Sequence, residues 1–228
     1  TAATEQDALI QAIVVASNTS NEETRIVPVL KILPSSKGKD RIALLKLLSH
    51  IGGTKALEPV VADLKSEDKA VLDAALRSLA DWPDMGAAPE LLKVIKESDD
   101  LVHKVLSLRG YVRITSASKV ATKQKVKMFR EAIDAAPRPD DKKLVLGGLS
   151  SIRSIEALQL AAKFLDDEAL QAEAVQAVVK IACPQNNRDK GLRGAPVFAA
   201  LQEVIKHAKN KDLKKKAENH LTSFPEGD

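Results

Sequence analysis

The chain has few of the residues that build disulfides, sheets or membrane spans. Among 228 residues it has one cysteine, one tryptophan, one tyrosine and four phenylalanines, so aromatic residues make up only 3%. A single cysteine, Cys183, excludes an internal disulfide and a zinc cluster built from several thiolates. Residues that favour strands are correspondingly scarce. No apolar run reaches the roughly 18 residues that a membrane helix needs, and no signal peptide opens the chain, so we expect no membrane insertion.

The abundant residues favour helices. Ala, Leu, Val, Lys and Glu fill most positions, apolar residues make up 44% of the chain, and charged residues make up 29%. This composition is typical of a folded helical protein rather than a disordered one. The sequence therefore predicts a soluble, all-α protein. Because the chain begins with Thr1 rather than Met, we expect a trimmed or processed chain that has lost any targeting signal.

Charge is distributed unevenly along the chain. The net charge is +4, but residues 1–100 carry −4 and residues 101–228 carry +8. A basic half indicates either an acidic partner or a lysine-rich surface that only faces water, and the second interpretation is the commoner one.

The chain repeats itself with a period near 31 residues. The segment SHIGGTKALEPVVADLK at 49–65 returns as SSIRSIEALQLAAKFLD at 150–166, with the same apolar positions. Longer steps coincide with three loops, at 34–39, 115–121 and 184–194. Self-similarity at this period is the signature of stacked helical hairpins.

Two kinds of helical stripe alternate within the repeats. First helices have apolar residues at i, i+1, i+4 and i+7, and second helices have them at i, i+3, i+4 and i+7, so each helix has one apolar face. The first-helix stripes are Leu9, Ile10, Ile13, Ala16; Leu44, Leu45, Leu48, Ile51; Ala75, Leu76, Leu79, Trp82; Ser107, Leu108, Tyr111, Ile114; Val145, Leu146, Leu149, Ile152; and Ala174, Val175, Val178, Ile181. The second-helix stripes are Ile26, Val29, Leu30, Leu33; Leu57, Val60, Val61, Leu64; Ala88, Leu91, Leu92, Ile95; and Leu158, Ala161, Ala162, Leu165.

Two further second helices interrupt the stripe with a polar residue at i+4. Arg130 follows Val126 and Phe129, and Gln202 follows Phe198 and Leu201. At these positions either the phase of the helix slips or a polar group replaces an apolar one.

Hairpins made of two helices of about a dozen residues each cannot bury both stripes alone, so we expect them to stack sideways and share one core. The sequence predicts a single domain over 1–228. Its expected fold is an α-solenoid, a right-handed superhelix of HEAT-like or armadillo-type hairpins with about six repeats. Ala217, Leu221 and Phe224 form a final stripe beside the charged Glu218, which is typical of a C-terminal capping helix.

The pattern within each repeat resembles a known family. A unit near 31 residues with glycine between its helices and proline early in the second, as in GGTKALEPVVADL, is similar to the short bacterial HEAT-like repeats of phycobilisome lyases. The segment LVLGGLSSIRSIEALQLAAKFLDDEALQAEAVQAVVKIA also resembles HEAT modules of large exported bacterial proteins that carry sugar-active or haem domains. The resemblance implies an α-solenoid and favours an exported or periplasmic location over a cytoplasmic one. Scaffolds, adaptors, inhibitors and some enzymes share this repeat, so it implies no single function.

Motifs for catalysis or metal binding are absent. None of the four histidines lies in HExxH, and none is followed by Glu as in the di-iron HEAT-repeat hydroxylases; they are His50, His103, His207 and His220. No phosphate loop or serine elbow occurs. We therefore expect no catalytic residue, no metal ligand and no cofactor.

Other conspicuous residues have structural interpretations. The acidic runs at 99–100, 140–141 and 166–168 precede first helices, where carboxylates bind free amide groups and meet the positive end of the helix dipole. Gly147-Gly148 lies inside a first helix at a cost of about 1 kcal/mol each relative to Ala, which predicts close helix packing there. Cys183 is expected to be a small buried residue rather than a reactive thiol.

Equivalent positions on successive second helices are expected to form rows across a concave wall. The row at i+5 consists of Lys31, Ala62, Lys93, Glu131, Lys163 and Glu203, with alternating charge from Lys93 onward. The alternation indicates either ion pairs between repeats or a mixed-charge strip that binds a protein segment. Two inserted loops add basic residues at one edge, where repeat proteins often bind partners. These residues are Lys119, Lys123, Lys125, Lys127 and Arg130 in and after one loop, and Arg188, Lys190 and Arg193 in the other.

The sequence favours a non-catalytic scaffold that binds a protein, or a neighbouring domain of its own parent chain, through the concave face and the insertion loops. The candidate partner-binding residues are Lys93, Lys127, Arg130, Glu131, Lys163 and Gln202. One alternative is a nucleic-acid-binding protein of the HEAT-like DNA-repair glycosylase type, which the basic half supports and the scarcity of aromatic residues opposes. Another is a lyase-type enzyme, which would need a deep pocket with converging acid and base groups.

Overall fold

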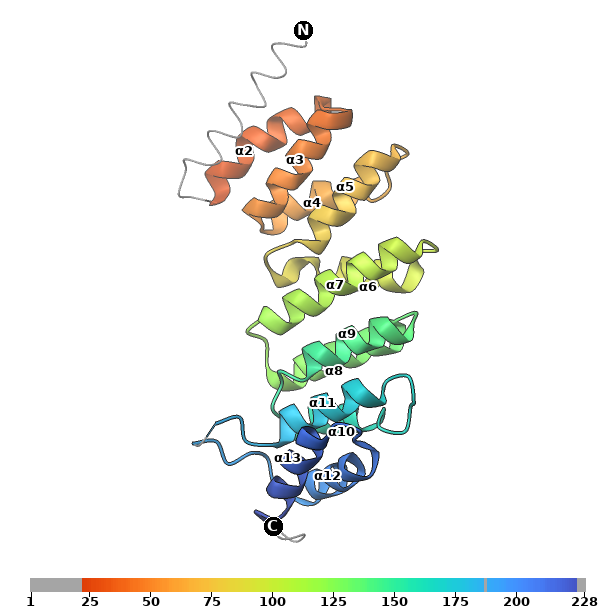
Figure 1. The fold of residues 1–228 in the computed structure, drawn as a ribbon. Helices are drawn as coiled ribbons and strands as arrows, with labels where there is room; N and C mark the ends of the chain where they lie inside the picture. The colour runs from red at the N-terminus through yellow and green to blue at the C-terminus, as the bar shows by residue number, and fades with distance from the viewer. Residues whose placement is uncertain (1–21, 187, 225–228) are drawn as a thin grey trace. The chain divides into compact units, whose positions relative to one another are not determined.

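The computed structural model describes residues 22–186 and 188–224, and the regular structure in them is entirely helical. Twelve α-helices and two short 3-10 helices follow one another, with no strand among these residues (Figure 1), which confirms the all-α prediction. The chain divides into two compact units, unit 1 (residues 1–114) and unit 2 (residues 115–228). The stripe predicted at 9–16 lies outside the described residues. No helix in the described ranges has both the length and the apolar character needed to cross a membrane.

Unit 1 is built from helices that pack with alternate neighbours as well as adjacent ones. Its elements are α2 (Glu22–Ile32), η1 (Leu33–Ser35), α3 (Gly38–Ile51), α4 (Thr54–Asp63), α5 (Lys69–Ala80), η2 (Met85–Ala87), α6 (Ala88–Glu97) and α7 (Leu101–Ala117), of which α7 runs past the unit boundary. Helix α3 packs on both α4 and α5, and α2 packs on both α3 and α4. First helices therefore contact first helices and second helices contact second helices.

Unit 2 follows the same scheme. Its helices are α8 (Thr122–Ala135), α9 (Pro139–Leu149), α10 (Ile155–Ala162), α11 (Gln171–Ala182), α12 (Ala195–His207) and α13 (Lys211–Leu221). The first helices α9, α11 and α13 pack in series, as do the second helices α8, α10 and α12. Each unit thus has two layers of helices with the apolar stripes between them.

Burial confirms the phase of the predicted first-helix stripes, whereas on the second helix α4 the buried positions are Ala56, Val60 and Asp63, one residue earlier than the predicted stripe. In α5, α9 and α11 all four first-helix positions are buried, including Trp82 just after α5, and in α3 only Ile51 is half-buried. The glycine pair after α3 ends the helix as predicted, with φ of 75° at Gly52 and 79° at Gly53. These values lie in the left-handed region that glycine adopts without strain.

The prediction of close packing at Gly147 is wrong. A Cβ placed on Gly147 would meet no atom within 4 Å, because this face of α9 is open to solvent. The close approach occurs at Gly110 in α7, where an added Cβ would lie 2.6 Å from the carbonyl oxygen of Ala80 and 2.7 Å from its Cα. Three residues later, the Arg113 guanidinium donates hydrogen bonds to the carbonyl oxygens of Ala80 (2.9 Å) and Trp82 (2.5 Å), which closes the C-terminal end of α5.

Candidate functional site

The six candidate partner-binding residues all lie on second helices or at their ends, and none is buried. Lys93 belongs to α6 in unit 1, whereas the other five belong to unit 2: Lys127, Arg130 and Glu131 on α8, Lys163 at the C-cap of α10, and Gln202 on α12. Lys127 and Glu131 form an ion pair at 4.0 Å along α8. This pair lies within one helix, so it is not one of the ion pairs between repeats that the alternating row suggested.

The interruption at Arg130 is a substitution at a half-exposed position. The interruption at Gln202 is a slip of one residue in helix phase, because the buried positions of α12 are Val197, Ala200, Leu201 and Val204. On α8, Val126, Phe129 and Ile133 are buried in the expected phase while Arg130 is exposed. The same i+4 position is half-buried in the other second helices, at Leu30, Val61, Leu92 and Ala162. Packing therefore tolerates a polar side chain at this position, and Arg130 and Gln202 extend into solvent.

A groove beside α8 brings Lys127 and Arg130 together. This α8 groove has a volume of about 560 Å³ and is lined by Ala121, Lys123, Gln124, Val126, Lys127, Arg130 and Glu156. Three of these residues are cations and one is an anion, so the groove is net positive. Within the described ranges Arg130 makes neither an ion pair nor a hydrogen bond, so its charge is available to a ligand.

A second groove, in unit 1, contains Lys93. It has a volume of about 540 Å³, with an apolar floor and a rim of mixed charge. Val61, Leu64, Leu72, Leu76 and Val94 contribute the apolar surface, and Lys65, Glu90, Lys93, Glu97 and His103 contribute the rim. Its charges balance, so it offers less electrostatic preference than the α8 groove.

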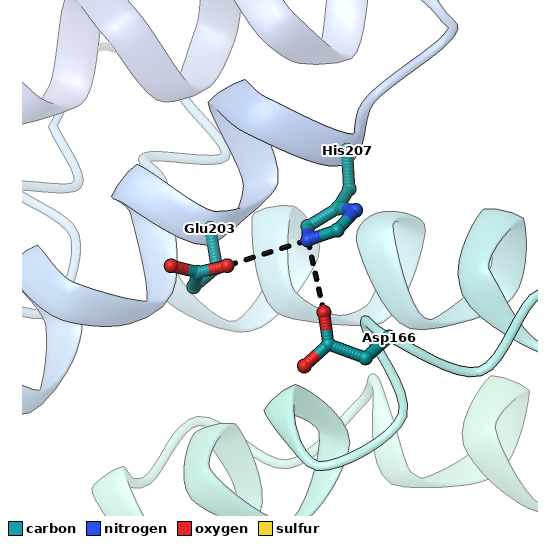
Figure 2. A group of neighbouring side chains, drawn as sticks. All are labelled: Asp166, Glu203 and His207. Carbon is teal, nitrogen blue, oxygen red and sulfur yellow. Dashed lines mark ion pairs between the residues drawn. The ribbon is translucent and has the colours of Figure 1, made fainter.

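Three side chains that the sequence analysis did not connect meet on the second-helix layer of unit 2. Figure 2 shows Asp166, from the turn after α10, and Glu203, from α12, approaching the same ring nitrogen of His207. The His207 Nε2 lies 3.0 Å from Asp166 Oδ1 and 3.3 Å from Glu203 Oε2. In the sequence, the i, i+4 spacing of Glu203 and His207 on one helix is the signal for this cluster, whereas Asp166 lies in an acidic run that is typical of helix capping.

The ring of His207 is held from its other side. The Gln171 side-chain amide contacts His207 Nδ1 at 3.1 Å and donates to the carbonyl oxygen of Leu165 at 3.0 Å, both through Nε2. Because Leu165 offers only an acceptor, the amide must present its NH2 group there, and Nδ1 then accepts the second N–H. The neutral ring therefore carries its proton on Nε2, which faces the two carboxylates.

The other acidic runs behave partly as predicted. Asp100 caps α7 by accepting hydrogen bonds from the backbone N–H groups of His103 and Val102, and these bonds hold the pKa of its carboxyl below the ordinary value. Asp141 does not cap a helix: it is buried and accepts two hydrogen bonds from Arg138. These two hydrogen bonds fix Arg138, the residue just before α9, to the first turn of that helix.

The long loop at 184–194 is fastened at several points. The backbone N–H groups of Gly191 and Gln185 and the guanidinium of Arg153 bind the Asp189 carboxylate and lower its pKa. His220, buried on α13, contacts the carbonyl oxygen of Leu192 at 2.8 Å through Nε2. Figure 1 shows this loop projecting from unit 2 on the left. Its basic residues Arg188 and Lys190 are exposed.

Cys183 is buried, as predicted, and burial raises the pKa of its thiol to about 11. At pH 8 the thiolate fraction is then about 100-fold below that of a thiol with the ordinary pKa of 9.0. We expect iodoacetamide to leave the native chain unmodified at pH 8 and to alkylate it after unfolding in urea, as measured by mass spectrometry. Rapid modification of the native chain would contradict the inert assignment.

In comparisons with known proteins, no family model matches the chain and no curated protein matches it.

Proposed function

We propose that the chain is a HEAT-like α-solenoid scaffold that binds an acidic segment of a protein partner, or of a neighbouring domain of its own parent chain. The serial packing of first helices on first helices and of second helices on second helices, seen within each unit, supports this architecture. A solenoid leaves its second-helix layer open for binding, and all six candidate residues are on that layer.

The observation that carries the proposal is the α8 groove. Lys123, Lys127 and Arg130 line it against a single anion, Glu156. Arg130 occupies a position where other second helices have an apolar residue, and its charge has no partner in the described part of the chain. An acidic segment would gain charge-assisted hydrogen bonds from these groups, with apolar contact to Val126 at the base.

The test is a double charge reversal, Lys127→Glu with Arg130→Glu. We expect the variant to bind a fluorescein-labelled polyglutamate peptide at least about tenfold more weakly than the unaltered chain, because two attractive charges become repulsive. The matched control is Lys211→Glu with Lys215→Glu on α13, which makes the same change in net charge at exposed positions outside the groove. Helical circular dichroism should be the same in all three proteins.

Equal loss of binding in both variants would show that only net charge matters, and would refute the groove assignment. Nucleic acid is the rival ligand, because phosphates also seek cationic grooves. Duplex DNA binding whose affinity falls steeply with salt, together with no peptide binding, would favour that rival.

A further inference from the structure

We propose that Asp166, Glu203 and His207 form a binding site for a divalent transition metal of the zinc class. The site is separate from the α8 groove and does not depend on the proposed function. It combines two carboxylates and one imidazole, a donor set that suits zinc and its neighbours better than Mg²⁺ or Ca²⁺, which prefer oxygen alone. Among the described residues this is the one group of three such side chains with ligand atoms close enough to share an ion.

The distances agree with a shared ion. Bonds of about 2.0 to 2.2 Å from zinc to nitrogen and oxygen place neighbouring ligand atoms about 2.8 to 3.6 Å apart in tetrahedral or octahedral geometry. The two contacts from His207 Nε2, at 3.0 Å and 3.3 Å, fall within this range. All three ligand atoms lie within 4.8 Å of one another, so a small rotation of the exposed Asp166 side chain completes the set.

The decisive observation is that His207 Nε2 is buried and has no hydrogen-bond partner in the described part of the chain. Both carboxylate oxygens are near enough to accept a hydrogen bond, but neither lies along the N–H direction of the ring. Figure 2 shows the two contacts leaving Nε2 in different directions, one to each carboxylate. A ligand along the N–H direction would satisfy the nitrogen and both carboxylates at once.

The surroundings suit a cation. Glu203 and His207 lie in the last turns of α12, where the negative end of the helix dipole favours positive charge. Lys206 already pairs with Glu203 at 3.2 Å, but its ammonium is on a flexible side chain that is 66% exposed, so an ion can displace it. Asp166 is 84% exposed, which leaves coordination positions open to water or to a ligand from a partner.

Gln171 controls the protonation of the ring. Metal binding at Nε2 requires the single proton of the neutral imidazole to move to Nδ1, and the Gln171 amide must then turn its oxygen toward that proton. This turn gives up the hydrogen bond to the Leu165 carbonyl oxygen. A glutamate at position 171 has no N–H group to donate to Leu165, so it would accept the Nδ1 proton without losing a hydrogen bond when the metal binds.

The test is titration of the whole chain with zinc chloride by isothermal calorimetry. We expect one zinc ion per chain and at least about tenfold weaker binding in both His207→Ala and Asp166→Asn; the second change is at an exposed position where folding is not at stake. His50→Ala is the control, because His50 is an exposed histidine in unit 1. We expect Gln171→Glu to bind zinc about tenfold more tightly than the unaltered chain.

Three results would overturn the site. They are the absence of binding at millimolar zinc, affinity that His207→Ala leaves unchanged, and an equal loss of affinity in His50→Ala. Affinity that Gln171→Glu leaves unchanged would also contradict ligation through Nε2.

Discussion

Replacing Arg41 with alanine is expected to lower the free energy of unfolding by about 3 kcal/mol. The guanidinium donates hydrogen bonds to both Asp63 carboxylate oxygens at 2.7 Å and to the Leu33 carbonyl oxygen at 2.8 Å. One side chain thereby joins the start of α3 to the end of α4 and to η1. The Asp63 side chain is only 10% exposed, so the alanine variant would leave a desolvated carboxylate without its partner.

The matched control is Arg77→Ala. Arg77 also pairs with a carboxylate at 2.7 Å, that of Asp73, but the two side chains are 60% and 44% exposed. Water replaces such a pair at a cost of about 0 to 1 kcal/mol. Urea unfolding can be followed by the fluorescence of Trp82, the only tryptophan, which is fully buried in unit 1. Equal losses of unfolding free energy in the two variants would refute the expectation that burial makes the Arg41–Asp63 pair more stabilising than the Arg77–Asp73 pair.

Replacing Gly110 with alanine is expected to lower the free energy of unfolding by about 2 kcal/mol. Alanine gains about 1 kcal/mol over glycine as a helix former. The added methyl group, however, would meet the backbone of Ala80 at 2.6 Å and 2.7 Å, and backbone does not rotate away as a flexible side chain does. The cost of overpacking, about 3 kcal/mol at the upper end of its usual range, exceeds the gain because α7 must move off α5.

Gly147→Ala provides the control with the opposite expected sign. It makes the same chemical change inside α9, where no atom lies within 4 Å of the new methyl group. Only the helix-forming gain remains, so the free energy of unfolding should rise by about 1 kcal/mol. Urea unfolding of both variants by circular dichroism checks the pair, and destabilisation by Gly147→Ala would contradict the open surface at that position.

The sequence located part of the candidate site. It placed Lys127 and Arg130 on a second helix outside the buried stripe, and the structure brings both to the α8 groove. It did not join Asp166 to His207, because these residues belong to different repeats and no local pattern links them. Their contact depends on how closely α12 packs against α10.

The amino-acid sequence predicts the helices, their order and the buried face of most of them; on α4 and α12 the buried face lies one residue earlier than the predicted stripe. These properties follow from a period of 3.6 residues and from glycine and proline at the helix ends, which act over a few neighbouring positions. Tertiary structure alone decided which of two helical glycines is pressed against a neighbour, and which acidic residue meets His207. Both depend on the separation of helices that are distant in the chain, and that separation is set by the packing of all the side chains between them.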